Sequence, residues 1–194
     1  MRVCPTESYS EVDSLRKSIC VVDTDLVARE SMGFLLQSNG FHVRTASAVE
    51  DVISGNADLP TDLFMLDFST SGLRSEHIQG LQFVHPRASI VLTTEYDELA
   101  ACLQAMDLGI YDVLLKPLDE QTVLKVARDA TSTQRYAKFW MGRSPRTRRA
   151  VTEYRLLSEK GYYVSMQDIS RRYGWSPGIA TIQQAFSRLR KQLL

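Results

Sequence analysis

Four short apolar runs of this sequence each end in polar side chains that could carry phosphoryl chemistry. These side chains are Asp23 and Asp25, Asp67, Thr93 and Thr94, and Lys116. Carboxylates that converge repel one another, so a cation stabilises them at neutral pH, and oxygen ligands with room for water favour Mg²⁺. A carboxylate beside Mg²⁺ can attack a phosphoryl group and become an acyl phosphate. A lysine would neutralise the added charge, and a threonine hydroxyl would donate a hydrogen bond to a phosphoryl oxygen.

Strands are needed to position these side chains, and the apolar runs have the composition of strands buried on both faces. We expect such strands at Ser18–Val22, Leu63–Asp67, Ser89–Thr93 and Asp112–Leu115, with a strand nearer an edge at Phe41–Ala46. Helices are expected over Asp25–Asn39, Ala48–Ser54, Glu76–Val84, Glu98–Leu108 and from Asp119 to Trp140. This alternation predicts a doubly wound α/β fold whose parallel strands all end at one edge, which would bring the candidate side chains together.

The charge is divided unevenly along the chain. Residues 1–130 carry ten Lys and Arg against twenty Asp and Glu, and residues 131–194 carry thirteen against three. The formal charges of −10 and +10 cancel in the whole sequence. An acidic front and a basic tail predict two domains with different partners, and the basic one suits a polyanion such as nucleic acid.

Residues 18–131 resemble the receiver domain of two-component response regulators, a flavodoxin-like fold of five strand–helix pairs. The resemblance rests on V-V-D-T-D-L-V-A-R-E-S, the strand ending at Asp67, I-V-L-T-T, and G-I-Y-D-V-L-L-K-P-L. It implies that Asp67 accepts a phosphoryl group from a sensor histidine kinase and that Asp23 helps to bind Mg²⁺. It also implies that Lys116 contacts the phosphoryl group and that a threonine acts as the switch. The sequence leaves Thr93 and Thr94 as alternatives for that threonine.

Two positions depart from the receiver pattern. Receivers usually have two adjacent acidic residues after the first strand, whereas Thr24 occupies the second position here. We expect Asp25, at the next position, to replace that ligand in part. Ser71 stands where receivers usually have a proline, four residues after the phosphoacceptor. A pseudo-receiver that keeps the fold and works without phosphate is therefore a second interpretation.

A phosphatase of the haloacid dehalogenase type is a third interpretation. The run I-C-V-V-D-T-D-L-V fits the D-x-D-x-[TV] signature of that family, in which Asp23 would be the nucleophile and Asp25 the general acid and base. That family needs a further acidic pair on a strand after the lysine, whereas Asp119 and Glu120 open a predicted helix. It would also leave Asp67 and the basic tail without a role.

The basic tail has the pattern of a small all-α helix-turn-helix domain, in which the second helix enters the major groove of DNA. Met141–Arg149 is rich in Arg, Gly and Pro and is expected to be a linker or basic arm. The helical segments beyond it resemble the OmpR-type winged helix, while the S-P-R-T-R-R lead-in is closer to LuxR-type domains. The expected DNA contacts on the last helix are Thr181, Gln183, Gln184, Ser187, Arg188, Arg190 and Lys191.

The sequence thus predicts a DNA-binding response regulator rather than an enzyme, apart from self-catalysed phosphotransfer and dephosphorylation. Its expected parts are a loose arm (1–17), a receiver (18–133), a helix extension and linker (134–143) and a helix-turn-helix domain (144–194). The expected partners are a sensor histidine kinase, double-stranded DNA, a second copy in an active homodimer, and RNA polymerase. Three cysteines without metal spacing and the lack of a membrane-length apolar run predict a cytoplasmic location.

Overall fold

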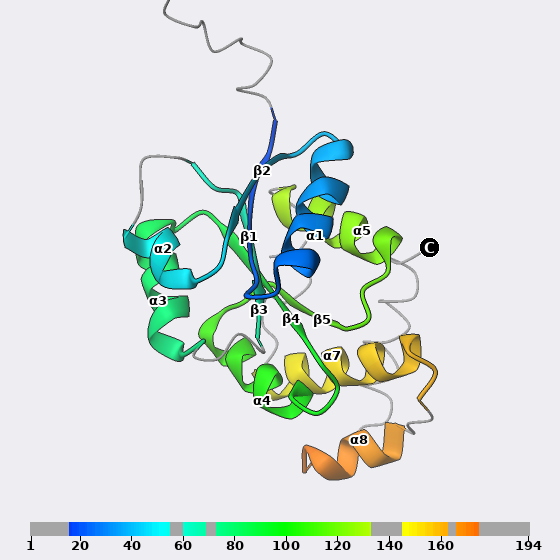
Figure 1. Ribbon diagram of the computed structural model, residues 1–194. Coiled ribbons are helices and arrows are strands. Elements are labelled where there is room, and N and C mark those ends of the chain that lie inside the picture. Colours follow the sequence, from blue (N-terminus) through cyan, green and yellow to red (C-terminus); the bar gives the residue numbers. More distant parts are fainter. Residues whose placement is uncertain (1–15, 55–59, 69–72, 133–144, 163–165, 175–194) are drawn as a thin grey trace, which may run out of the picture.

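A five-stranded parallel sheet organises the computed structural model, which describes residues 16–54, 60–68, 73–132, 145–162 and 166–174 (Figure 1). The strands are β1 Ser18–Val22, β2 His42–Ala46, β3 Leu63–Asp67, β4 Ser89–Thr94 and β5 Asp112–Leu115. Their order is β2-β1-β3-β4-β5, and every neighbouring pair is parallel. The order reverses between β1 and β3, where doubly wound sheets form a crevice at the carboxyl ends of the strands. The predicted flavodoxin-like sheet is confirmed.

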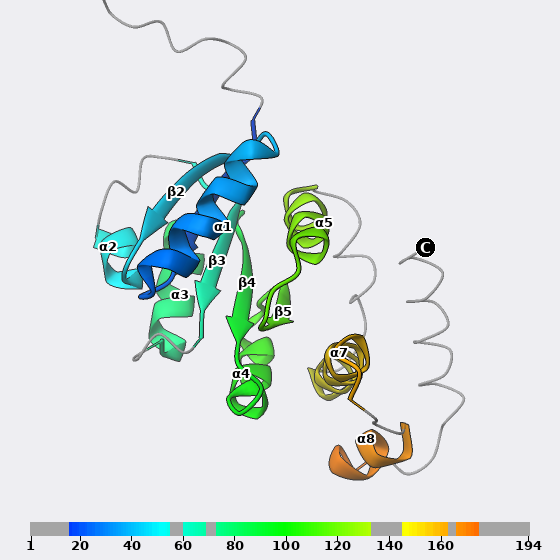
Figure 2. The ribbon, with the colours of Figure 1, turned by 45° about the vertical axis from the view of Figure 1, so that its right-hand side comes forward.

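Helices cover both faces of the sheet (Figure 2). On one face lie α1 Leu26–Ser38 and α5 Glu120–Thr131. On the other lie α2 Val49–Ser54, α3 Ser75–Val84, α4 Leu99–Gln104 and the 3₁₀ helix η2 Ala105–Leu108. Alternate strand residues join the two cores, so that Ile19 and Val21 face α1 and α5 while Cys20 and Val22 face the other helices.

Three predicted element boundaries were wrong. The helix expected over Glu98–Leu108 is α-helical only to Gln104 and tightens to a 3₁₀ turn, which Gly109 ends with a left-handed φ of 83°. The helix expected to reach Trp140 ends at Thr131, and Ser132 is extended. The hydroxyls of Thr131 and Ser132 donate to the carbonyls of Ala127 and Asp129, and such local bonds compete with helix continuation.

The third wrong boundary is that of the expected linker Met141–Arg149, because α7 Pro145–Glu159 already begins within it. Proline is favoured at the first helical position, where its missing N–H has no partner to lose. A short helix, α8 Met166–Arg172, follows α7. Among the described residues, no helix combines the length and apolar character needed to cross a membrane.

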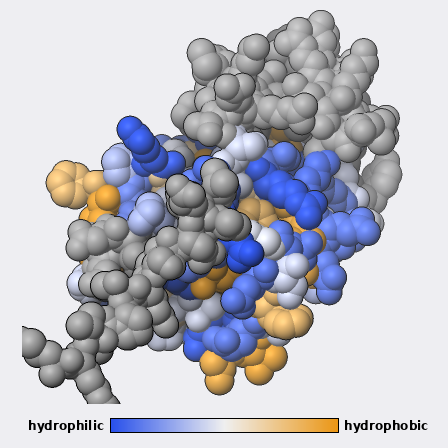
Figure 3. All heavy atoms as spheres, turned by 90° about the horizontal axis from the view of Figure 1, so that it is seen from above, coloured by the Kyte–Doolittle hydropathy of each residue, from blue (hydrophilic) through white to orange (hydrophobic). Residues whose placement is uncertain are grey.

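Seen from above, the surface is largely hydrophilic, and its hydrophobic side chains form separate small patches (Figure 3). The large hydrophobic side chains that are exposed in the described residues are Leu26, Val27, Phe34, Phe83, Tyr96 and Tyr162. Leu26, Val27 and Phe34 lie on α1, and the rings of Tyr96 and Tyr162 stack with their centroids 4.8 Å apart. The apolar side chains of the strands are instead buried in the two cores, which hold the strand ends in place.

Candidate functional site

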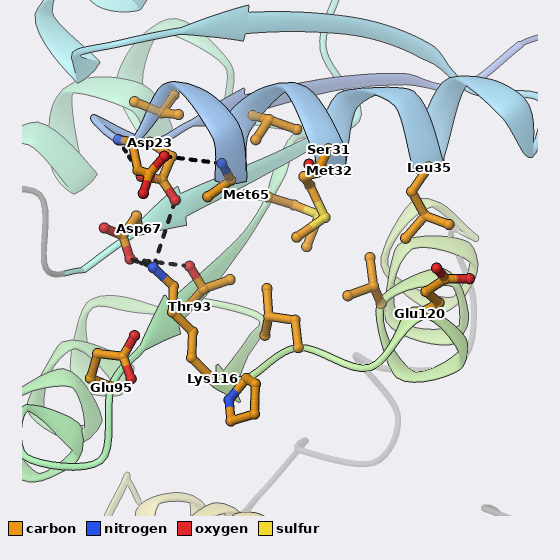
Figure 4. Close-up of a pocket in the computed structure, with 17 residues that line it drawn as sticks. Asp23, Ser31, Met32, Leu35, Met65, Asp67, Thr93, Glu95, Lys116 and Glu120 are labelled. Atoms are coloured by element: carbon orange, nitrogen blue, oxygen red, sulfur yellow. Dashed lines mark hydrogen bonds and ion pairs between the residues drawn. The ribbon is translucent and has the colours of Figure 1, made fainter.

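Four predicted site residues gather at the carboxyl edge of the sheet, on the face covered by α1 and α5 (Figure 4). They are Asp23, Asp67, Thr93 and Lys116. The two-residue period of a strand explains their meeting, because each lies an even number of residues from a side chain in the core of that face. Asp23 lies two residues after Val21, for example, and Lys116 two residues after Leu114.

Asp67 is the centre of this cluster. It is the last residue of β3 and is only 6% exposed. Lys116 Nζ lies 2.8 Å from Asp67 Oδ1, and the Thr93 hydroxyl donates to the same oxygen at 3.4 Å. The carboxylate therefore already has beside it one cation and one hydroxyl that could bind an added anionic group.

Lys116 also reaches Asp23, whose Oδ2 lies 3.7 Å from Nζ. Burial by itself lowers the pKa of Lys116, but the hydrogen bond and charge of Asp67, with the charges of Asp23 and Glu95, outweigh it, so the pKa is raised. Lys116 is thus held as a cation between two carboxylates.

Asp23 carries the opposite balance. Burial raises its pKa, the backbone N–H of Asp25 lowers it through a 2.9 Å hydrogen bond to Oδ1, and the charge of Asp67 raises it again. Lys116 lowers it as well, yet the net pKa is above the ordinary value. A carboxyl with this balance favours the arrival of a further cation, which would return it to the charged form.

Asp25 lines the same cavity as these four residues, and backbone N–H groups occupy one of its carboxylate oxygens. It is the N-cap of α1, and its Oδ1 accepts from the backbone N–H of Val27 at 2.7 Å and of Ala28 at 3.2 Å. An aspartate at this position satisfies helix donors that would otherwise lack partners. Oδ1 of Asp25 therefore serves to start α1.

The register of the sheet separates Thr93 from Thr94. Thr93 pairs with Asp67 across β3 and β4, so the two side chains emerge on the same face. Thr94 emerges on the opposite face, where its hydroxyl donates to the Glu95 carbonyl at 3.2 Å and hydrogen-bonds the buried Cys102 thiol. Of the two threonines, Thr93 is therefore the one that contacts Asp67.

A cavity of about 540 Å³ opens beside the cluster and continues between α1 and α5. Asp23, Asp67, Thr93 and Lys116 line its polar end, and Glu95 lies at the same end (Figure 4). Its other end is mainly apolar, with the side chains of Met32, Leu35, Met65, Leu118 and Val123. Asp67 thus lies on the wall of this cavity.

The donor set suits a magnesium ion held by two carboxylates. Among the described residues, no three His, Cys, Asp or Glu side chains lie close enough to form a metal-binding group. Mg²⁺ in proteins is often bound by only one or two carboxylates and keeps several waters. Asp23 and Asp67, at the wall of an open cavity, meet that requirement.

The seven predicted DNA contacts between Thr181 and Lys191 lie outside the described residues. Sequence reasoning also missed a pair that the structure brings together, Asp112 at the start of β5 and Arg155 in α7. Arg155 Nη2 lies 2.7 Å from Asp112 Oδ1, and both side chains are largely buried. A carboxylate that opens a buried strand was the available signal, but nothing in the sequence identified its partner 43 residues away.

Comparison with known proteins agrees with this geometry. The transcriptional regulatory protein FixJ of Azorhizobium caulinodans is 26% identical over 109 residues, covering 56% of this chain and 52% of FixJ. The response regulator protein PilR of Pseudomonas aeruginosa is 26% identical over 145 residues, covering 74% of this chain and 31% of PilR. The chain thus spans about half the length of FixJ and less of PilR.

The fold has solved counterparts as well. The crystal structure of a response regulator receiver domain protein from Clostridium thermocellum matches with a TM-score of 0.54 at 22% identity, covering 59% of this chain and 94% of that one. Residues 19–128, more than half of the chain, match the response regulator receiver domain family. With the parallel sheet and the Asp67 cluster in place, this match shows that the chain belongs to the response regulator receiver domain family.

Proposed function

We propose that this chain is a transcriptional response regulator whose Asp67 accepts a phosphoryl group from a sensor histidine kinase. The observation that carries the proposal is the surrounding of Asp67, which has Lys116 at 2.8 Å and Thr93 at 3.4 Å on the wall of an open cavity. The relatives FixJ and PilR are named as a transcriptional regulatory protein and a response regulator. Their names support a regulatory rather than a catalytic role.

The transfer is a substitution at phosphorus. A carboxylate oxygen of Asp67 forms a bond to the phosphorus of a phosphohistidine, and the phosphorus–nitrogen bond breaks. The histidine nitrogen leaves with the electron pair and takes up a proton from water. Lys116 Nζ would neutralise the new phosphoryl oxygens, and the Thr93 hydroxyl would donate to one of them.

Asp23 and Asp67 would hold a Mg²⁺ ion, which supplies charge neutralisation as the phosphoryl group approaches. Asp25 supports this pair indirectly. Its backbone N–H fixes Asp23 Oδ1, and its side chain starts the helix that follows. The side chain of Asp25 is thus proposed as a cap, in place of the metal ligand that the spacing suggested.

The phosphatase interpretation has less support than the receiver. Its general acid and base would be Asp25, which the structure uses as the cap of α1. Its nucleophile would be Asp23, whose Oδ1 accepts a hydrogen bond from the Asp25 backbone N–H. The family match, over residues 19–128, is to the receiver domain.

The basic tail is proposed to bind double-stranded DNA, with α8 and the residues after it supplying a helix-turn-helix. A second copy would double the length of DNA that is contacted when the protein is active, and RNA polymerase would be a further partner.

The affinity of the protein for DNA should fall steeply as the salt concentration rises, because Lys and Arg side chains release counterions from the DNA phosphates when they bind. Arg188→Ala or Gln184→Ala should weaken binding to a specific site by ~1–3 kcal/mol in a gel-shift titration. A flat salt profile would point to a protein partner instead.

A further inference from the structure

Asp23 is the carboxylate of the β1–α1 loop that meets Lys116 at the polar end of the cavity. The next residue, Thr24, is exposed and carries no carboxylate. Mg²⁺ demands near-ideal octahedral geometry at short distances, so a carboxylate that swings freely is a poor ligand for it. The aim of the Asp23 side chain therefore decides much of what this loop can contribute to a Mg²⁺ site.

Three of the four polar groups of Asp23 have a close hydrogen-bond partner. Its backbone N–H donates to the carbonyl of Ala46 at 3.3 Å, and its Oδ1 accepts from the N–H of Asp25 at 2.9 Å. Its backbone carbonyl accepts from Nη1 of Arg29 at 2.7 Å. The fourth group, Oδ2, has a longer contact of 3.7 Å with Lys116 Nζ. Oδ2 is thus the oxygen of Asp23 best placed to receive a metal ion.

Arg29 is the residue in this set that reaches Asp23 with a side chain. Its own backbone N–H donates to the Asp25 carbonyl at 3.0 Å, so Arg29 binds the loop twice, through its backbone and through its guanidinium. The guanidinium is also held from outside, because Nε lies 3.8 Å from Glu30 Oε1. The side chain of Arg29 is 14% exposed, whereas that of Glu30 is 60% exposed.

The position of Arg29 in α1 is unfavourable for a cation. It is the fourth residue of the helix, and α1 has no acidic residue in its first turn. The helix dipole favours negative rather than positive side chains at this end. The contact with the Asp23 carbonyl gives a reason for an arginine here, because a guanidinium can bind a carbonyl with one nitrogen and a carboxylate with another.

We propose that Arg29 is a positioning residue for Mg²⁺, because its guanidinium holds the backbone carbonyl of Asp23 and thereby aims Oδ2 toward Asp67. This inference rests on the proposed binding of Mg²⁺ by Asp23 and Asp67. Arg29 is not among the residues that line the cavity, so it acts through Asp23 and not on the metal ion itself. Residues that orient metal ligands in this way typically change metal affinity by about 10- to 100-fold.

The sign of the effect separates positioning from simple charge. If only the charge of Arg29 mattered, removing it would strengthen the binding of a cation nearby. Positioning predicts the opposite. Arg29→Met keeps the aliphatic stem and removes the guanidinium, and we expect it to weaken Mg²⁺ binding by about 10-fold or more, measured by titration calorimetry on the full chain.

The choice of metal separates positioning from a general structural role. Ca²⁺ accepts flexible geometry, whereas Mg²⁺ does not, so Arg29→Met should weaken the binding of Mg²⁺ more than that of Ca²⁺. Arg29→Lys keeps a cation that can donate to the same carbonyl and should recover part of the lost Mg²⁺ affinity. Arg87→Met is the matched control, because Arg87 is exposed in the turn between α3 and β4, at the opposite edge of the sheet. It should leave both affinities unchanged.

The outcomes separate this inference from the proposed function. Wild-type binding of Mg²⁺ that is unchanged or tighter in Arg29→Met would overturn the positioning role and leave the proposed function standing. Equal losses for Mg²⁺ and Ca²⁺ would show a general structural role and would overturn it as well. No binding of Mg²⁺ to the wild type would overturn both the inference and the proposed metal site. If circular dichroism shows Arg29→Met to be unfolded, Arg29→Lys takes its place, with a smaller loss that is again greater for Mg²⁺ than for Ca²⁺.

Discussion

The buried pair Asp112–Arg155 allows the most quantitative prediction about how α7 is held. Both side chains are 13–14% exposed, and the 2.7 Å contact is supported by the Val113 N–H, which donates to Asp112 at 2.8 Å. Arg155→Met keeps the aliphatic stem and removes the guanidinium, leaving a buried carboxylate without its cation. We expect the free energy of unfolding to fall by ~3–5 kcal/mol, the usual cost of breaking a buried pair from one side.

Substituting Asp112 as well allows a double-mutant cycle, which measures the coupling energy between Asp112 and Arg155. Asp112→Asn with Arg155→Met removes the buried carboxylate together with its cation, so the double variant should be less destabilised than the sum of the single variants. Double-mutant cycles on close charge pairs give couplings of ~1.5 kcal/mol or more. Arg171→Met is the matched control, because the exposed Asp168–Arg171 pair should contribute at most ~0.5 kcal/mol.

The pH dependence of the loss has a defined sign. Burial raises the pKa of Asp112 and the charge of Arg155 opposes it, with a net rise. An acid whose folded pKa is raised contributes stability that is present below its unfolded pKa and lost as the pH rises through the folded pKa. Removing Arg155 raises the folded pKa further, so the deficit of Arg155→Met relative to the wild type should shrink on acidification, as Asp112 becomes neutral.

Urea unfolding followed by far-ultraviolet circular dichroism at two pH values measures all of these quantities. A neutral-pH loss for Arg155→Met no larger than that of Arg171→Met would refute the reasoning that the pair anchors α7. A deficit that stays constant or grows on acidification would refute the assignment of the loss to a stranded carboxylate.

Three further predictions concern the site and the core. Asp25→Ala should lower the free energy of unfolding by ~1 kcal/mol, because α1 loses its cap. It should weaken Mg²⁺ binding, measured by titration calorimetry, less than Asp23→Asn does. A larger loss of Mg²⁺ affinity in Asp25→Ala than in Asp23→Asn would make Asp25 a ligand. Because the pKa of Asp23 is raised, the affinity for Mg²⁺ should begin to fall on acidification at a higher pH than it would with an aspartate of ordinary pKa. An affinity that does not change with pH would argue against Asp23 as a ligand. Leu156→Ala should lower the free energy of unfolding, measured with urea, by ~2–5 kcal/mol. A loss as small as that of an exposed residue would contradict the packing of α7 in the core.

The sequence was sufficient to predict the sheet and most of the site. Apolar runs that end in Asp23, Asp67 and Lys116 define strand ends, and parallel topology brings strand ends together. Thr93 and Thr94 remained alternatives because only the register between β3 and β4 decides which hydroxyl faces Asp67.

The other differences between prediction and structure arise where one sequence feature is compatible with two local structures. An aspartate before a helix, such as Asp25, reads equally well as a cap and as a ligand. Thr131 and Ser132 end α5 by bonding back to its carbonyls, whereas the apolar pattern continues past them. The docking of α7 depends on a buried ion pair between segments far apart in the chain, which neither periodicity nor composition reveals.

Acyl-phosphate formation tests the central claim most directly. The protein is incubated with acetyl phosphate and Mg²⁺, and the intact mass is measured for the wild type, Asp67→Asn and Asp23→Asn. We expect one phosphoryl group on the wild type and none on Asp67→Asn. No adduct on the wild type would indicate a regulator that works without phosphate, and an adduct that survives in Asp67→Asn but is lost in Asp23→Asn would contradict the receiver chemistry altogether.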